Sequence, residues 1–320
     1  MDSQGTRQTR SLYPPLSPYD SGWLDVGDGH EIYWEACGNR DGEPALFLHG
    51  GPGGSCQPDH RRLFDPEAYR IILFDQRGSG RSRPKGELQN NNTQALAADI
   101  EKLREALGVE NWLILGGSWG AALALAYAQR WPQRVRALVL RGVFTARQCE
   151  VDWLYKFGAS SIFPEAWQRF TAPIPEAERD NLVAAYHRRL TGDDINARRE
   201  AARTWCGWES ELLTLIPRGA RYSGVTEGDL ALARIEAHYF INKSFMPDGE
   251  LLAGMDPIAH IPGVIVQGRY DVVTPPRTAF ELAQIWPAAT LNIVPDAGHA
   301  TSEPGILAGL VEATDRFRDI

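Results

Sequence analysis

Short apolar runs alternate with helical patterns along the first part of the chain. The runs end at turn residues and indicate strands buried on both faces of a sheet. Such runs cover residues 45–49 and 70–74; strands are also predicted at 112–116 and 135–141, and residues 30–37 alternate in part. Strands that alternate with helices predict a mostly parallel sheet with right-handed crossovers.

Two helices are predicted between these strands. Residues 93–107 carry leucine and isoleucine at helical spacing, with Thr93 as the expected N-cap and Gly108 as the expected stop. Residues 120–131 form the second helix, which Pro132 ends.

The pattern changes after residue 144. Residues 145–250 are rich in Arg, Glu, Trp and Ala at helical spacing, and strand patterns return only at 263–268 and 290–294. Helices are expected at 276–286 and about 304–318. We therefore predict an α/β core, 1–144 and 251–320, with a helical cap inserted at 145–250. The insertion begins after a core strand, at the edge of the sheet where α/β folds place their sites.

Composition excludes several classes without naming a function. The 320 residues include 43% hydrophobic and 23% charged residues, as in ordinary globular proteins, and the net charge is −8. An acidic chain has no global attraction for nucleic acid or anionic membranes. No apolar run reaches the roughly 18 residues of a membrane span. The N-terminus lacks the apolar region of a signal peptide, so we expect a cytoplasmic protein, as a monomer or small homo-oligomer.

The strongest local motif is Gly-Gly-Ser-Trp-Gly at 116–120. It fits G-x-S-x-G and lies between a predicted strand and a predicted helix, the context in which a serine is held on a tight turn at a helix N-terminus. Ser118 is therefore the candidate nucleophile. The alternative is a serine that only caps a helix in a glycine-rich turn.

A serine nucleophile needs a base and an orienting acid. In α/β-hydrolases the acid and the histidine follow the serine along the chain, on loops after later strands. Asp271 follows the strand at 263–268, and His299 follows the strand at 290–294. Taken singly, these could be a turn aspartate and a surface histidine, but their order and positions favour a triad with Ser118.

A glycine-rich loop, His-Gly-Gly-Pro-Gly-Gly at 49–54, follows another predicted strand. Acyl transfer needs N–H donors for an oxyanion, and in this fold they come from such a loop and from the residue after the nucleophile. Gly51 and Trp119 are the expected donors. The loop lacks the Gly-Lys-Ser/Thr of a phosphate-binding loop. His49 is expected to support the loop.

Three segments together resemble the proline iminopeptidases, serine peptidases of the α/β-hydrolase fold: 49–54, 74–82 (FDQRGSGRS) and 116–135. The similarity continues through 140–144 (LRGVF), 153–167, 204–209 (TWCGWE) and 234–240 (RIEAHYF).

The resemblance implies a serine exopeptidase that releases N-terminal proline from peptides without a metal or cofactor. Besides Ser118, Asp271 and His299, it implies that Glu209 and Glu236 bind the substrate's amino group. The negative charge of two glutamates is consistent with this role, since a buried ammonium needs anionic acceptors. It also places Phe144 and Tyr155 near a pocket for the proline ring. Gln76 and Arg77 are expected to support the loops.

One departure concerns the loop after Asp271. Some relatives have a cysteine in a D-x-C-x-P segment, whereas residues 271–275 here read Asp-Val-Val-Thr-Pro. The sequence therefore does not determine whether substituted prolines are accepted.

An alternative function within the same class of hydrolases also stays open. It is an esterase or amidase for small acyl substrates, which would need no glutamate pair.

Overall fold

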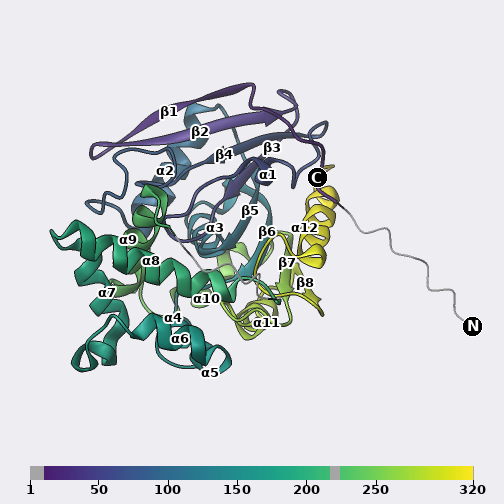
Figure 1. Cartoon of the computed structure of the whole chain (residues 1–320). Coiled ribbons are helices and arrows are strands. Elements are labelled where there is room, and N and C mark those ends of the chain that lie inside the picture. Colours follow the sequence, from purple (N-terminus) through teal and green to yellow (C-terminus); the bar gives the residue numbers. More distant parts are fainter. Residues whose placement is uncertain (1–10, 217–223, 320) are drawn as a thin grey trace, which may run out of the picture.

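The protein is described by a computed structural model over residues 11–216 and 224–319. Within these ranges the strands form a single sheet of eight, in the order β1-β2-β4-β3-β5-β6-β7-β8 (Figure 1). The strands are β1 Asp20–Gly27, β2 His30–Gly38, β3 Glu43–Leu48, β4 Tyr69–Phe74, β5 Trp112–Ser118, β6 Val135–Val143, β7 Gly263–Gly268 and β8 Ala289–Val294.

The sheet is parallel from β4 to β8 and antiparallel at its other end. β2 pairs with β1 and with β4 in antiparallel register, while β3, β5, β6, β7 and β8 follow in parallel. The carboxyl ends of the parallel strands therefore meet at one edge. This arrangement confirms the predicted α/β-hydrolase architecture with a mostly parallel sheet.

Helices cover both faces of the sheet. One face packs against α2 (Thr93–Ala106), α3 (Trp119–Arg130) and α11 (Pro276–Gln284), and the other against α12 (Pro304–Arg316). Fully buried apolar residues of β3, β5 and β6 form the centre of both layers. The remaining short elements are α1 Pro58–Arg61, α10 Glu250–Ala253, and the 3-10 turns η1 Pro132–Arg134, η3 Lys243–Phe245 and η4 Asp256–Ile258.

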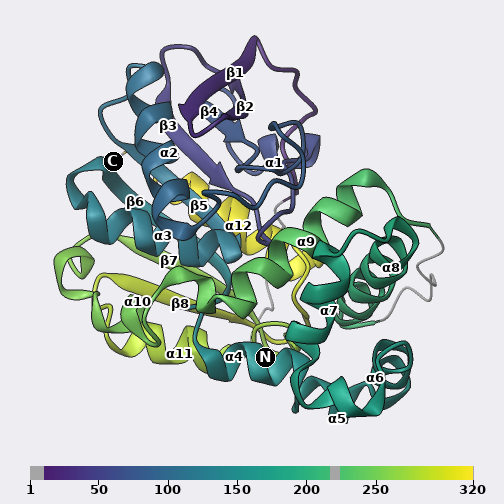
Figure 2. The ribbon, with the colours of Figure 1, turned by 90° about the vertical axis from the view of Figure 1, so that its left-hand side faces the viewer.

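Between β6 and η3, six helices and a 3-10 turn of the described residues gather at one side of the sheet (Figures 1 and 2). They are α4 Gln148–Tyr155, α5 Ala159–Ile162, α6 Pro164–Thr171, η2 Glu176–Asn181, α7 Leu182–Thr191, α8 Ile195–Leu212 and α9 Glu227–Ile241. We call this group the cap helices. The pattern of 145–250 predicted its helical content.

Two local expectations need correction. The alternating pattern of β1 was not recognised from the sequence, because only Val26 of that strand is buried. The N-cap of α2 is Asn92 and not Thr93: the Asn92 side chain accepts the Ala95 N–H, while the Thr93 hydroxyl donates to the Ser244 carbonyl. Gly108 does end α2, with a φ of 64°. Within the described ranges, we find no helix long and apolar enough to cross a membrane.

Candidate active site

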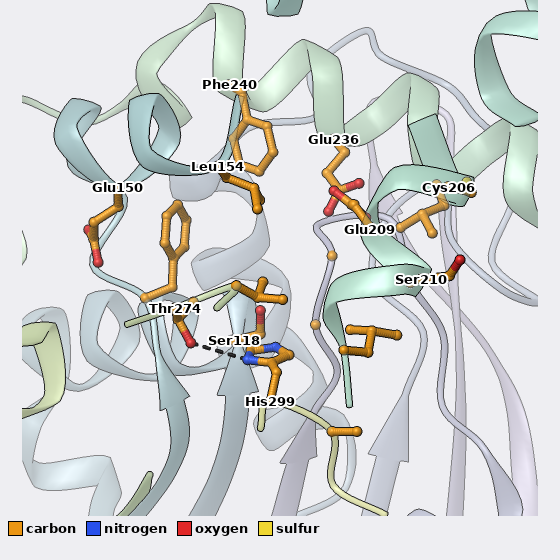
Figure 3. Close-up of a pocket in the computed structure, with 18 of the residues that line it drawn as sticks. Ser118, Glu150, Leu154, Cys206, Glu209, Ser210, Glu236, Phe240, Thr274 and His299 are labelled. Carbon is orange, nitrogen blue, oxygen red and sulfur yellow. Dashed lines mark hydrogen bonds between the residues drawn. The ribbon is translucent and has the colours of Figure 1, made fainter. Parts of the chain in front are cut away.

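A cavity of about 440 Å³ lies between the carboxyl edge of the sheet and the cap helices (Figure 3). Its floor comes from the loop after β3, the end of β5 and the loops after β6, β7 and β8; its roof comes from α4, α8 and α9. Of the residues predicted for the site, seven line it: Gly51, Ser118, Phe144, Tyr155, Glu209, Glu236 and His299.

Ser118 occupies the turn between β5 and α3. Its backbone has φ 58° and ψ −123°, a conformation that a residue with a side chain rarely adopts. The flanking chain is packed so closely that a Cβ on Gly120 would lie 2.2 Å from the Leu48 carbonyl oxygen. Glycine is therefore required beside the serine, and the turn presents Ser118 to the cavity at the N-terminus of α3.

His299 and Asp271 lie in contact on neighbouring loops. His299 Nδ1 is 2.8 Å from Asp271 Oδ2, and both side chains are buried. Asp271 also accepts hydrogen bonds from the Thr274 N–H and hydroxyl, at 2.8 and 3.0 Å. The carboxylate is thus fixed, and a proton on Nδ1 leaves Nε2 of the ring as the basic nitrogen. Burial lowers the pKa of His299, although Asp271 opposes that shift.

Gly142 makes room for this histidine. A Cβ there would lie 2.8 Å from His299 Cε1, and Gly142 has a φ of 54°. The irregular register between β5 and β6 falls at the same level of the sheet. The bend at the end of β6 thus places the imidazole over the strand that carries the serine.

A polar network fixes the two segments expected to supply oxyanion donors. Gln76 donates its side-chain N–H to the His49 carbonyl at 2.9 Å and accepts from the Trp119 indole N–H at 2.9 Å. Its backbone N–H donates to His49 Nε2 at 3.0 Å. Gly51 lines the cavity, whereas Trp119 is fully buried next to Ser118 and its side chain does not line the cavity.

Two carboxyl groups, on the half-buried Glu209 of α8 and the buried Glu236 of α9, face the cavity from the cap helices (Figure 3). Tyr155 donates its hydroxyl to Glu209, and Trp205 donates its indole N–H to Glu236 at 2.8 Å. The two carboxyl groups are close enough to influence each other's ionisation. Burial raises the pKa of both groups, and the proximity of Glu209 raises that of Glu236 further. Neither has an arginine or lysine within ion-pair distance in the described part of the chain.

Aromatic rings form the apolar wall beside this carboxyl pair. Phe240 lies 6.1 Å from Phe144 and 5.5 Å from Tyr155, between ring centroids. Tyr155 stacks on Trp205 at 4.4 Å. Val273, in the loop where some relatives have a cysteine, also lines the cavity. The wall offers a slot for a compact apolar group next to two acids.

Sequence reasoning missed three residues that touch this site: Arg141, Trp205 and Thr274. Trp205 and Arg141 lie inside the segments 204–209 and 140–144 that carried the resemblance. Arg141 also interrupts the apolar run of β6 at its carboxyl end, a signal that could have identified it. Thr274 gave no such signal, because its contact with Asp271 depends on the shape of the loop.

No cluster of three or more His, Cys, Asp or Glu side chains able to hold a metal ion is found in residues 11–216 and 224–319. The arrangement of a strained serine, a buried histidine–aspartate pair and candidate N–H donors is suited to acyl transfer through a covalent intermediate.

The sequence and the structure were compared with those of known proteins, and the matches support the fold and identify a family within it. Residues 43–305 match the family described as alpha/beta hydrolase fold. The chain is 52% identical to a proline iminopeptidase of Arabidopsis thaliana over 97% of this chain and 82% of that protein. It is 51% identical to a probable proline iminopeptidase of Leptolyngbya boryana, over 96% and 97%. Among solved structures, a bromoperoxidase from Bacillus anthracis shares the fold at 18% identity with a TM-score of 0.63, over 94% of this chain and all (100%) of that one.

Proposed function

The chain belongs to the proline iminopeptidase family of the α/β-hydrolase fold, and on this premise we propose that it is a serine exopeptidase that releases an N-terminal proline from peptides. Ser118 is the nucleophile, His299 the base and Asp271 the orienting acid. The backbone N–H groups of Gly51 and Trp119 hold the oxyanion.

The observation that carries the substrate assignment is the carboxyl pair in the roof of the cavity. Glu209 and Glu236 line the same cavity and interact electrostatically, and a cation between them would relieve the repulsion that their ionised forms suffer. The secondary ammonium of an N-terminal proline is such a cation. An endopeptidase or a simple esterase has no use for this pair, because its substrates carry no charge beside the scissile carbonyl.

The apolar wall of the cavity provides a binding surface for the pyrrolidine ring of proline. Phe144 and Tyr155 line the cavity together with Phe240, and a pyrrolidine packed against them removes apolar surface from water. Val273 stands in the same cavity and adds a branched aliphatic group. The wall sets the size of the side chain accepted at the first position.

The reaction then follows from the placement of the groups. Ser118 Oγ attacks the prolyl carbonyl carbon as His299 Nε2 takes its proton, and the carbonyl π electrons move to the oxygen held by Gly51 and Trp119. Collapse breaks the C–N bond, and His299 gives the proton to the leaving amine. Water, deprotonated by His299, cleaves the prolyl ester and frees proline and Ser118.

We assign cleavage of the bond and recognition of the free amine to two different parts of the chain. The core, residues 1–144 and 251–320, supplies the triad and the oxyanion donors. The cap, residues 145–250, supplies the carboxyl pair and most of the apolar wall. Recognition of the free amine and cleavage of the bond are thus built on separate elements that meet at the cavity.

Hydrolysis of a panel of aminoacyl arylamides tests this function. We expect the proline arylamide to be the best substrate and Ser118→Ala to abolish its hydrolysis. Glu209→Gln and Glu236→Gln should each lower kcat/KM for the proline arylamide by tenfold or more, since a charged hydrogen bond contributes about 1.5–3 kcal/mol. Hydrolysis of p-nitrophenyl acetate, which has no amine, should change little.

Two results would contradict the proposal. Equal rates across the panel would overturn the preference for proline. Activity that survives in Ser118→Ala would overturn the serine mechanism.

A further inference from the structure

Arg141 at the carboxyl end of β6 brings a positive charge to the floor of the cavity. It lines the same cavity as Ser118 and His299, and it is the one lysine or arginine among the residues that line it in the described chain. Its guanidinium makes no ion pair within residues 11–216 and 224–319, and its Nε has no hydrogen-bond partner there. Arg141 is half-buried, and a partly desolvated cation that has no ion-pair partner gains from binding a complementary anionic ligand.

Arg141 remains charged at this place. Burial lowers the pKa of Arg141 to about 10, and Asp271 is the group that opposes the shift. Arg141 Nη1 donates to His299 Nε2 at 2.9 Å and to the His299 carbonyl at 3.2 Å. A Cβ on Gly117 would lie 2.5 Å from Arg141 Nη2, so the guanidinium also lies against the turn that precedes Ser118.

The contact with Nε2 places the guanidinium on the leaving-group side of the scissile bond. His299 Nε2 must come within hydrogen-bond distance of the leaving nitrogen in order to protonate it. Arg141 Nη1 lies at hydrogen-bond distance from the same Nε2 atom. The guanidinium is therefore next to the second residue of the substrate. In a dipeptide, the terminal carboxylate is attached through one carbon to that leaving nitrogen.

The cavity thus has negatively charged groups at one end and a positively charged group at the other. The carboxyls of Glu209 and Glu236 come from the cap helices, and the guanidinium of Arg141 comes from the sheet. Ser118 lies at the sheet as well, beside the cation. A zwitterion with its ammonium on the first residue and its carboxylate on the second matches this distribution of charge.

We propose that Arg141 binds the terminal α-carboxylate of dipeptides that begin with proline, and so makes Pro-X dipeptides better substrates than longer or amidated peptides. The proposal rests on the proposed function and extends it to the second residue. A two-pronged guanidinium–carboxylate contact fits the planar fork of arginine. It also draws Nη1 away from His299 Nε2, which frees that nitrogen to accept the proton of Ser118.

The experiment compares kcat/KM for Pro-Gly and Pro-Gly-NH2 in wild-type protein and in Arg141→Gln. We expect the ratio of acid to amide to fall by about tenfold or more in Arg141→Gln, as for the loss of a charged hydrogen bond. Comparing ratios cancels the intrinsic difference between the two leaving amines. Arg169→Gln, an arginine half-exposed on the cap and paired with Glu211, is the matched control and should keep the wild-type ratio. If Arg141→Gln does not fold, Arg141→Met replaces it.

The outcomes separate this proposal from the proposed function. If both substrates lose activity equally in the variant, Arg141 serves only His299 and the proposal is overturned, while the peptidase function stands. An unchanged ratio overturns it as well. Failure of the wild-type protein to hydrolyse any prolyl substrate would overturn the proposed function and this inference with it.

Discussion

At the scale of single residues, the most informative feature is a pair of acids that the fold brings together in the cavity. Glu209 and Glu236 are held by Tyr155 and Trp205, both uncharged donors. Such donors stabilise a carboxylate less than a cation does, and the pKa of each acid is raised. The empty pair therefore retains a proton at pH values where exposed glutamates have lost theirs, and a bound ammonium would replace that proton.

A pH dependence follows for substrates with a free amine. For a proline arylamide, kcat/KM should fall as the pH decreases through the raised pKa of the carboxyl pair, because the protonated pair cannot accept the ammonium. For p-nitrophenyl acetate the fall should occur at lower pH and reflect His299, whose pKa lies below the usual 6.5. Two pH–kcat/KM profiles on the same protein check this.

Glu200→Gln, an exposed acid on α8, is the control and should leave both profiles in place. Acid limbs that coincide for the two substrates would contradict the link between the carboxyl pair and the ammonium.

Candidate residues could be named from the sequence where a motif carries its own context, and their catalytic roles remain proposals. Ser118 follows from G-x-S-x-G between a strand and a helix, and Asp271 and His299 from their positions after later strands. Arg141 was not predicted because its meaning depends on a contact with His299, 158 positions away in the sequence. The raised pKa values likewise depend on burial, which only the packed cap creates.

At the scale of elements, Gln76 connects the loop after β4 to two others. It binds the His49 carbonyl in the loop after β3 and the indole of Trp119 at the start of α3. Those two segments carry the proposed oxyanion donors. Gln76 therefore acts on the reaction through their spacing, as a positioning residue without substrate contact.

Gln76→Met, which keeps the length of the side chain and removes its hydrogen bonds, should lower kcat by tenfold or more with little change in KM. The reason is that donors displaced by a fraction of an ångström stabilise the oxyanion poorly, and loss of one donor costs about 10²–10³ in kcat. Steady-state kinetics on a proline arylamide measure both constants.

Gln129→Met provides the comparison, since Gln129 on α3 holds the Leu251 carbonyl at 2.7 Å away from the cavity. Both variants lose a buried hydrogen bond, so both should unfold at lower temperature, but only Gln76→Met should lose kcat. A rise in KM alone for Gln76→Met would refute the positioning role.

Most strands of the parallel sheet were predictable because they are apolar runs that are largely buried on both faces, as in β3, β4, β5 and β7. β1 was not, since Val26 is its one buried residue and it pairs with β2 at the edge of the sheet. The start of α2 was misplaced by one residue because Asn92 and Thr93 are both good caps, and a contact of Thr93 with Ser244 decided between them.

At the scale of the whole molecule, the proposed function requires that the cap be held at a fixed distance from the core, because the carboxyl pair and the nucleophile would bind one small substrate. Asn91, a fully buried residue of the core, makes this connection. Its side-chain amide donates to the carbonyls of Arg77 and Glu87 at 3.0 Å, and its Oδ1 accepts the hydroxyl of Tyr239 on α9 at 2.9 Å. The sequence could not show this joint, because it links segments 148 positions apart.

Asn91→Ala should therefore affect both stability and recognition. Three buried polar partners lose their contact, so the free energy of unfolding should fall by about 1–3 kcal/mol, measured by urea denaturation. α9 carries Glu236 as well as Tyr239, and its displacement should raise KM for a proline arylamide several-fold. Hydrolysis of p-nitrophenyl acetate needs only the core and should keep its kcat/KM.

The control is Asn196→Ala, at an exposed asparagine in the first turn of α8, which should change none of these quantities. Equal loss on the arylamide and the ester would mean that Asn91 supports the core alone, and the placement of the cap would have to be assigned to its other contacts with the sheet.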